Sequence, residues 1–361
     1  MNKFLKIFIP IPLILITGGF PVASFSQTVG VNTIFELKGK VIVKKPQWKK
    51  PLPASVGLIL SFEDRLEVAA NASVKVYCSN LKTWTFKPGR YIVSSGCPLG
   101  NPVIRLPNSN NTTRRPTGNT ETALAKLPYL ITPRETAILT NRPRLRWNAV
   151  SGATNYTVNI DGVSWEAQTN KTEMVYPGQL PLEAGRRYRV TIKADNGESS
   201  TDDALVGFTI LDEQTKKTVL DAVKTVQQQQ LSPEEAGLVL AHLYRGYKLY
   251  GDAVEVLEGL VKQGGRVATV YQLLGDTYLE IGLPQLAKKT YENGLKLATN
   301  TENLAVQAEI QSGLGMAYRL LGNKDEAIRW LKKAKLGYGE LGDTSQVQKL
   351  DETINLILTR G

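Results

Sequence analysis

Residues of the types that carry catalysis are sparse in this sequence of 361 residues. The single histidine, His242, lies in a segment of helical periodicity, with no cysteine nearby. The sequence contains no G-x-S-x-G turn, no phosphate-binding glycine loop and no H-E-x-x-H pair. Acidic pairs such as Glu63-Asp64 and Asp202-Asp203 fall in expected turns, where adjacent carboxylates are usually solvated. We therefore expect a protein that is not an enzyme and that needs no cofactor and no small-molecule substrate.

The two cysteines offer a different chemistry. Cys78 and Cys97 lie 19 positions apart within one expected domain. With only one histidine in the chain, they cannot complete a four-ligand zinc site made of Cys and His. A disulfide is the usual fate of such a pair in an oxidising compartment, and it would stabilise the fold by about 3 kcal/mol. We predict that Cys78 and Cys97 form a disulfide bond and that the chain has no metal site.

Positive charge gathers in the first third of the chain. The net charge is +11, and residues 27–98 hold 11 basic against 4 acidic residues. Residues 99–127 hold 4 against 1, whereas the two signs nearly balance in the remainder. Nucleic acid is not an expected partner, because no recognisable nucleic-acid-binding fold accompanies the charge.

One basic run could bind a polyanion. Lys44, Lys45, Lys49 and Lys50 flank Trp48 in the run VKKPQWKKPLP, and its prolines disfavour a regular strand ladder. A basic loop with a central aromatic could hold an anionic wall polymer or a lipid headgroup. The alternative is a solvated, charged loop with no ligand.

The first 26 residues are typical of an export signal. Lys3 and Lys6 precede the apolar run 7–16, which contains two prolines and is shorter than the ~20 residues of a membrane-spanning helix. Small residues at Ser24 and Ser26 occupy the positions that a signal peptidase reads. We predict a cleaved signal peptide, residues 1–26, and a periplasmic or cell-envelope location. Retention as an anchor is the alternative.

Residues 27–98 alternate short β-rich runs with Gly, Pro, Asn and Asp, which predicts an all-β domain. The order of features is GKVIVKKPQW, an apolar run containing Gly57, then SFEDRLEVAANASVKVYC, and a Pro88-Gly89 turn before SSGCP. This order resembles the FecR-like domain of bacterial envelope proteins. Residues 99–127, rich in Asn, Thr, Pro and Gly, are predicted to be a flexible linker.

Residues 128–212 contain PRLRWNAVSGATNYTVNI and LPLEAGRRYRVTIKA, which resemble a fibronectin type III domain. The resemblance places Trp147 and Tyr156 in the core. It also places Leu182 and Tyr188 in the L-x-P-x-T-x-Y corner of that family, although the proline and the threonine are replaced. A tyrosine at such a strand start can hydrogen-bond to the backbone a few residues upstream. The implied role is that of a spacer or binding module.

From residue 213 onward the periodicity is helical. Residues 213–231 are predicted to be a connecting helix, and Ser232-Pro233-Glu234-Glu235 has the residues of an N-cap with a capping box. A set of five residues then recurs after 34 positions, the tetratricopeptide period, and again after a further 40 positions. The three sets are Leu240, Ala241, Tyr244, Ala253 and Leu257; Leu274, Gly275, Tyr278, Ala287 and Tyr291; and Leu314, Gly315, Tyr318, Ala327 and Leu331.

The recurring residues are packing residues. Small residues let two antiparallel helices approach closely, and the large residues fill the space beside them. Within a tetratricopeptide region at 232–361 we predict repeat units at 234–267, 268–301 and 308–341. About six residues are inserted between the second and third units, and a terminal helix from Asp343 to Thr359 caps the array. The predicted fold class is multidomain β + α: a small all-β domain, an Ig-like or fibronectin III-like sandwich and an α-helical solenoid.

In tetratricopeptide domains the first helix of each unit lines a concave groove. Carried over by register, the groove positions are Leu238, His242 and Arg245; Gln272, Asp276 and Leu279; and Ser312, Met316 and Arg319. The apolar members could bury side chains of a peptide, and the arginines and glutamine could hold carbonyls or a carboxylate. The resemblance implies an exported scaffold for a partner protein or peptide. The alternatives are a solvated spacer and attachment to an anionic polymer through the basic N-terminal domain.

Overall fold

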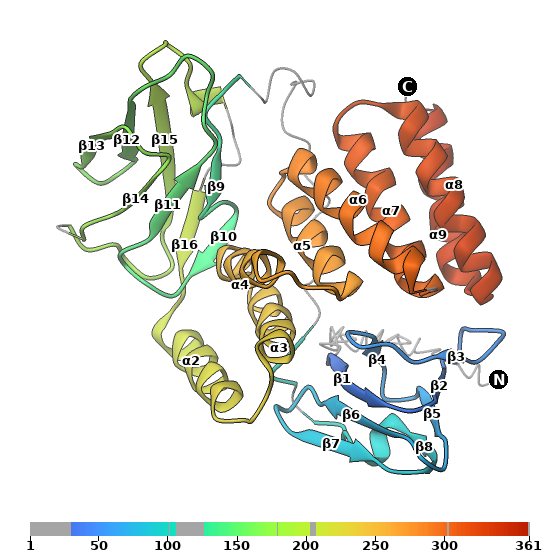
Figure 1. Cartoon of the computed structure of the whole chain (residues 1–361). Helices are drawn as coiled ribbons and strands as arrows, with labels where there is room; N and C mark the ends of the chain where they lie inside the picture. The colour runs from blue at the N-terminus through green and yellow to red at the C-terminus, as the bar shows by residue number, and fades with distance from the viewer. Residues whose placement is uncertain are drawn as a thin grey trace, which may run out of the picture.

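The computed structural model describes residues 30–100, 102–105, 126–178, 180–202, 207–301 and 303–359. The predicted signal peptide and residues 106–125 of the predicted linker lie outside the described residues. Two β-sheet regions precede the helices in sequence and contact them in space (Figure 1). The predicted fold class, β regions followed by an α-helical repeat array, is confirmed.

The N-terminal domain consists of two four-stranded antiparallel sheets. The first sheet has the order β4-β1-β6-β7, formed by Ile59–Leu60, Asn32–Lys38, Ser73–Tyr77 and Thr83–Phe86. The second has the order β3-β2-β5-β8, formed by Leu52–Pro53, Val41–Lys44, Arg65–Val68 and Gly89–Ile92. Gly39, with a φ of +70°, turns the chain from β1 into β2 and so from one sheet to the other. Hydrophobic residues from both sheets fill the space between them.

The predicted disulfide between Cys78 and Cys97 is present, and both residues are buried. Cys78 follows β6, and Cys97 follows a short 3-10 helix, Val93–Ser95. The bond therefore closes the end of the domain that lies beyond β8. Residues 102–105, which the sequence analysis placed in the linker, continue the domain. Ile104 is buried, and its carbonyl accepts a hydrogen bond from the Val31 N–H at 3.1 Å.

The second β region consists of a five-stranded and a three-stranded sheet. The larger sheet has the order β10-β16-β15-β12-β13, formed by Thr136–Ile138, Gly207–Ile210, Arg187–Ala194, Tyr156–Ile160 and Glu166–Thr169. The smaller has the order β14-β11-β9, formed by Glu173–Val175, Arg144–Trp147 and Leu130–Thr132. Trp147 and Tyr156, the predicted core aromatics, meet edge to face at 5.6 Å between ring centroids. The Tyr188 hydroxyl accepts a hydrogen bond from the Glu183 N–H at 2.7 Å, as predicted for the corner.

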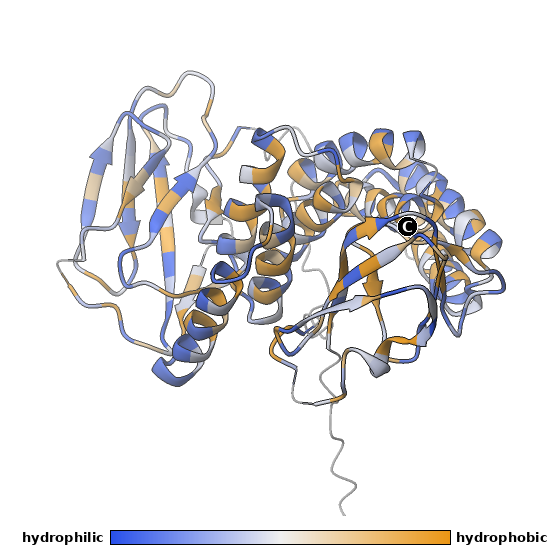
Figure 2. Ribbon diagram, turned by 60° about the horizontal axis from the view of Figure 1, so that its bottom comes forward, coloured by the Kyte–Doolittle hydropathy of each residue, from blue (hydrophilic) through white to orange (hydrophobic). Residues whose placement is uncertain are grey.

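The helical region begins with α2, Glu213–Gln227, and continues with three antiparallel helix pairs and a terminal helix. The pairs are α3 with α4, Pro233–Gly246 and Tyr250–Lys262; α5 with α6, Ala268–Glu280 and Pro284–Asn300; and α7 with α8, Leu304–Leu320 and Lys324–Leu341. The terminal helix α9, Thr344–Thr359, packs on α8. The predicted capping box is present, since the Ser232 and Glu235 side chains each accept a hydrogen bond from the other's backbone N–H. Figure 2 shows the hydrophobic residues gathered on the faces that the helices turn toward one another.

The predicted insertion between the second and third units lies where α6 ends and α7 begins. α6 and α7 have 17 residues each, whereas α4 and α5 have 13. The insertion therefore coincides with a longer pair of helices at this point, and its last residues, 304–306, form the first turn of α7.

The N-terminal domain contacts the array through apolar surfaces. Phe35 and Tyr77 pack in one buried cluster with Val226 of α2 and with Val239 and Leu243 of α3. Farther along the array, Trp48 packs in a second cluster with Ala305 of α7 and Leu341 of α8. Ala305 belongs to the insertion, so the inserted residues form part of the surface against which Trp48 packs.

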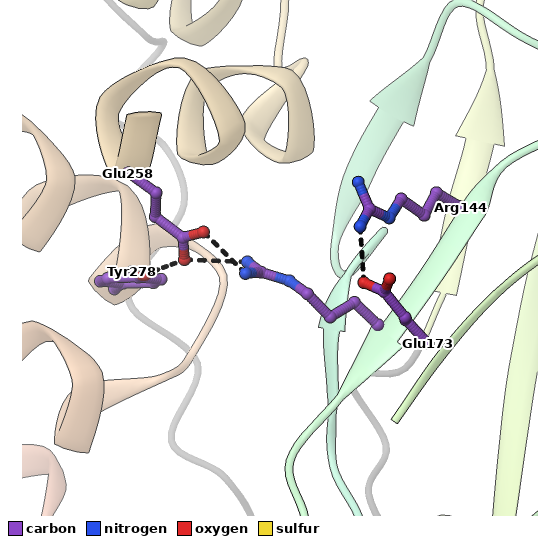
Figure 3. Close-up of polar contacts among 5 residues, drawn as sticks. Arg144, Glu173, Glu258 and Tyr278 are labelled. Atoms are coloured by element: carbon purple, nitrogen blue, oxygen red, sulfur yellow. Dashed lines mark hydrogen bonds and ion pairs between the residues drawn. The ribbon is translucent and has the colours of Figure 1, made fainter. Parts of the chain in front are cut away.

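The second β region contacts the array through polar groups and through Tyr129 and Ile131, which pack against the hydrophobic core of the array. The Arg134 guanidinium donates to the Ile281 carbonyl beyond α5 at 2.7 Å, and the Thr136 hydroxyl donates to the Lys248 carbonyl beyond α3 at 3.0 Å. The Arg146 guanidinium donates twice to the Glu258 carboxylate of α4, at 2.6 and 2.8 Å (Figure 3). The second β region thus contacts the array where α3 and α5 end and along α4, whereas the N-terminal domain contacts α2, α3 and the start of α7.

Candidate functional site

The nine predicted groove residues lie on α3, α5 and α7, the first helices of the three pairs. Their exposure differs. Leu238, His242 and Leu279 are buried and are therefore covered by neighbouring side chains. Arg245 is also largely buried, whereas Gln272, Asp276, Ser312, Met316 and Arg319 are half-buried. Binding of a partner by this set of residues stays a prediction.

Asp276 of α5 is the centre of a polar cluster. Its Oδ1 accepts a hydrogen bond from the Tyr291 hydroxyl at 2.6 Å, and its Oδ2 accepts one from the Gln272 amide at 2.9 Å. The Nη2 atom of Arg245 lies 3.8 Å from Oδ2. The structure therefore brings together three of the predicted groove residues, from two different helices. The Asp276 side chain remains 28% exposed.

Tyr291 of α6 reaches this cluster from the second helix of its pair. Its ring lies against Gly275 of α5 and Gly313 of α7, and a Cβ atom at either glycine would come 2.4 Å from a ring carbon. Only glycine leaves room for the ring there. In the other units the same position holds a leucine, Leu257 or Leu331, which has no hydroxyl. The repeat register predicts only a packing role for Tyr291, and its hydrogen bond to Asp276 was not predicted.

Two carboxylates next to the cluster were also missed. Glu280 of α5 and Glu309 of α7 are half-buried, and neither has a hydrogen-bond or ion-pair partner among the residues that the structure describes. Glu280 lies four positions after Asp276, and Glu309 lies three positions before Ser312. The helical spacing of three to four residues could therefore have added both of them to the predicted face.

Burial and mutual repulsion disfavour the charged forms of these carboxylates. Burial raises the pKa of Glu309 to about 7, and the negative charge of Asp276 adds to the shift. Burial also raises the pKa of Glu280, with Arg245 acting against this shift and Asp276 adding to it. Asp276 itself has a pKa raised by burial, although Arg245, Tyr291 and Gln272 all act to lower it. The cluster is therefore a recessed group of carboxylates whose charged forms are not fully compensated by nearby cations.

Two basic groups on α3 differ in what they can do. Burial lowers the pKa of His242 to about 3, so its imidazole is neutral, and its Nε2 has no hydrogen-bond partner among the described residues. The Arg245 side chain is 10% exposed, and Asp276 is the nearest carboxylate to its guanidinium. Its Nε atom is buried without an acceptor in the described part of the chain. Arg245 therefore retains unused donors that are directed at the cluster.

The lysine run does not act as one exposed loop. Trp48 is 7% exposed, and the Lys45 ammonium lies 3.3 Å from Asp64, donates to the Ile59 carbonyl at 2.7 Å and lies 5.5 Å from the centre of the Trp48 ring. Trp48 and Lys45 therefore point inward. Trp48 packs against the array, and Lys45 binds groups of its own domain. The other three lysines of the run, Lys44, Lys49 and Lys50, are exposed. Polyanion binding by these three stays a prediction.

Within the described ranges, no group of three or more His, Cys, Asp or Glu side chains is arranged to hold a metal ion. None of the helices in the described part of the chain is both long and apolar enough to cross a membrane.

Comparison with known proteins identifies the helical region. A family model for the tetratricopeptide repeat matches residues 266–335, which include α5, α6 and α7. The C-terminal region of the chain is therefore built of tetratricopeptide repeats preceded by β-sheet regions. No curated protein matches the chain.

Several solved structures are similar to part of the chain. BtubC from P. vanneervenii is 17% identical, with a TM-score of 0.30, and the match covers 41% of this chain and 73% of that one. MamA is 22% identical, with a TM-score of 0.29, and the match covers 41% of this chain and 93% of that one. A putative kinesin light chain with TPR-like repeats from Podosopora anserina is 19% identical, with a TM-score of 0.29, and the match covers 41% and 90% of the two chains. These scores are too low to support an inference about function.

Proposed function

We propose that the protein is an exported, non-enzymatic scaffold that binds a partner protein or peptide on the concave face formed by α3, α5 and α7. The tetratricopeptide repeats support this function, because such repeats generally bind protein partners. We further propose that the N-terminal domain is FecR-like and that the second β region is fibronectin III-like. Export is supported by the Cys78–Cys97 disulfide, which is typical of an oxidising compartment, and by the signal-like sequence of residues 1–26.

The observation that carries the proposal is the polar cluster around Asp276. Recessed polar groups in a folded protein normally satisfy one another. Here the buried Nε of Arg245 has no acceptor in the described part of the chain, and the half-buried Glu280 and Glu309 carboxylates near Asp276 have no hydrogen-bond partner there. A bound peptide could supply the missing partners, because its backbone carries both donors and acceptors.

A site-specific photo-crosslinker tests the location of the groove. We would place p-benzoylphenylalanine at Ser312, on the concave face, and at Lys332, an exposed residue of α8, in the full chain. The expected result is a crosslinked partner from position 312 and none from position 332. Thermal melts of both proteins would check that the fold is retained. Capture from position 332, with none from position 312, would contradict the proposed groove.

A second candidate function is attachment to an anionic polymer. It is favoured by the exposure of Lys44, Lys49 and Lys50 on one segment of a basic domain. Replacing these three lysines with Gln should abolish salt-sensitive cosedimentation with an anionic wall polymer, because the charge is removed while Trp48 and Lys45 are kept. Replacing three exposed lysines elsewhere, Lys289, Lys332 and Lys333, is the control and should leave the sedimentation unchanged. Equal sedimentation of both variants would contradict attachment through the loop.

A further inference from the structure

We infer that the concave groove receives a cationic side chain, so that the bound segment of the partner is an extended peptide carrying Lys or Arg. The inference rests on the proposed function and specifies the chemistry of its ligand. It follows from the charges that α3, α5 and α7 place together, and from the hydrogen-bond donors that remain unused beside them.

The carboxylates of the groove outnumber the cations available to them. Asp276, Glu280 and Glu309 act on one another, since Asp276 raises the pKa of both glutamates. Arg245 partly offsets the charge of Asp276 and Glu280, but its closest approach to a carboxylate is 3.8 Å. A carboxylate and a guanidinium in direct contact lie closer, at about 2.7–2.9 Å.

Other cations near the groove are already engaged. Lys45 acts on Glu309 from the N-terminal domain, but its ammonium is paired with Asp64. Arg319 of α7 has an interaction of its own. Lys248 lowers the pKa of Glu280, but it is exposed at the end of α3, where water screens its charge. An additional cation beside Asp276 and Glu309 would therefore find carboxylates that this chain does not fully neutralise.

Arg245 is an independent indication of a ligand. A guanidinium has five N–H donors, and burying it without hydrogen bonds is costly. Its Nε has no acceptor in the described part of the chain, and the side chain is directed at the same cluster. Main-chain carbonyls of an extended peptide could accept hydrogen bonds from these donors without adding negative charge. A carboxylate ligand at the same point would instead lie beside Asp276 and Glu280 and would be repelled by both.

The test uses the full chain, a phage-displayed library of random peptides and two variants with equal net charge. E280Q/E309Q removes two groove carboxylates, and E340Q/E352Q removes two exposed carboxylates of α8 and α9. Peptides selected on the wild type should carry Lys or Arg at one shared position. Their Kd should rise about tenfold or more on E280Q/E309Q and should be unchanged on E340Q/E352Q. Replacing the shared Lys or Arg with Gln should weaken binding to the wild type but cause no further loss on E280Q/E309Q.

Selected peptides that lack Lys and Arg, or whose affinity is unaffected by E280Q/E309Q, would overturn the inference. The proposed function would survive that result if the probe at Ser312 still captured a partner. Absence of capture at Ser312, together with peptides that bind outside the groove, would overturn the proposed function itself.

Discussion

The two β regions contact the same helical array with different proportions of apolar and polar contacts. The N-terminal domain buries Trp48 against Ala305 and Leu341, and a second apolar cluster joins its first sheet to α2 and α3. The second β region packs the partly buried Tyr129 and Ile131 against the core of the array, and it adds charged and polar contacts, of which the Arg146–Glu258 pair is the most extensive (Figure 3). Burial acts to raise the pKa of Glu258. The hydrogen bonds from Arg146 and Tyr278 outweigh this effect, so the pKa is lowered.

This difference between the two interfaces determines which β region separates more easily from the array. Apolar contacts are lost only at the cost of exposing their surface to water, and salt does not weaken them. Ion pairs in partly exposed interfaces contribute less free energy than buried apolar contacts, and salt screens them. We therefore expect the N-terminal domain and the array to unfold together, and the second β region to be the more easily detached part.

The largest expected effect comes from the apolar contact. Trp48→Ala should lower the free energy of unfolding by about 3–5 kcal/mol, because it empties a well-packed site shared by the domain and the array. The control is Trp84→Ala in β7, where the tryptophan is 49% exposed and the expected loss is below about 1 kcal/mol. Urea unfolding of both variants measures the difference. Equal losses would show that Trp48 contributes no more than a surface residue.

A smaller effect is expected from the polar contact. Arg146→Ala should cost about 2 kcal/mol, because Glu258 is partly buried and would lose its charged partner. Arg144→Ala is the matched control, since the Arg144–Glu173 pair lies on the surface of the same β region and should contribute less than about 1 kcal/mol. The loss for Arg146→Ala should shrink in high salt. A loss that is insensitive to salt, or no larger than that of Arg144→Ala, would remove the contrast between the two interfaces.

The smallest expected effect concerns Glu309 of α7, which lies near the polar cluster around Asp276. Its pKa of about 7 lies above the ordinary value of 4.5, so the native state binds the proton more tightly than the unfolded state. The stability from this group is complete below pH 4.5 and is lost as the pH rises toward 7. Glu309→Gln should therefore stabilise the protein by about 1 kcal/mol at pH 8, a value reduced from the full shift because the side chain is half-exposed. Urea unfolding at pH 4 should show no such gain, and a gain of equal size at both pH values would rule out ionisation as its cause.

The helices were predictable because their determinants are local. Small and large residues at a fixed period report helix pairing directly, and the capping box at Ser232 and Glu235 lies within four residues. The disulfide was predictable for a related reason, since the chain has only two cysteines. The hydrogen bond of Tyr188 spans five residues and was inferred from the corner alone.

The packing of Trp48 and the polar cluster around Asp276 depend on residues that are distant in the sequence. A tryptophan among lysines and prolines has the composition of a surface loop, and its partners Ala305 and Leu341 lie more than two hundred positions away. From the sequence, the six inserted residues are only an added length between two repeat units. In the structure one of them, Ala305, packs against Trp48. Tyr291 joins the polar cluster because Gly275 and Gly313, on two other helices, leave space for its ring.

A structure of the full chain with a peptide selected on the wild type bound is the most direct test of the central claim. We predict that the peptide lies along α3, α5 and α7, with its Lys or Arg in contact with Asp276 and Glu309 and with a main-chain carbonyl accepting from Arg245. A peptide seated on the lysine run of the N-terminal domain, or on the outer face of α6 and α8, would contradict the account.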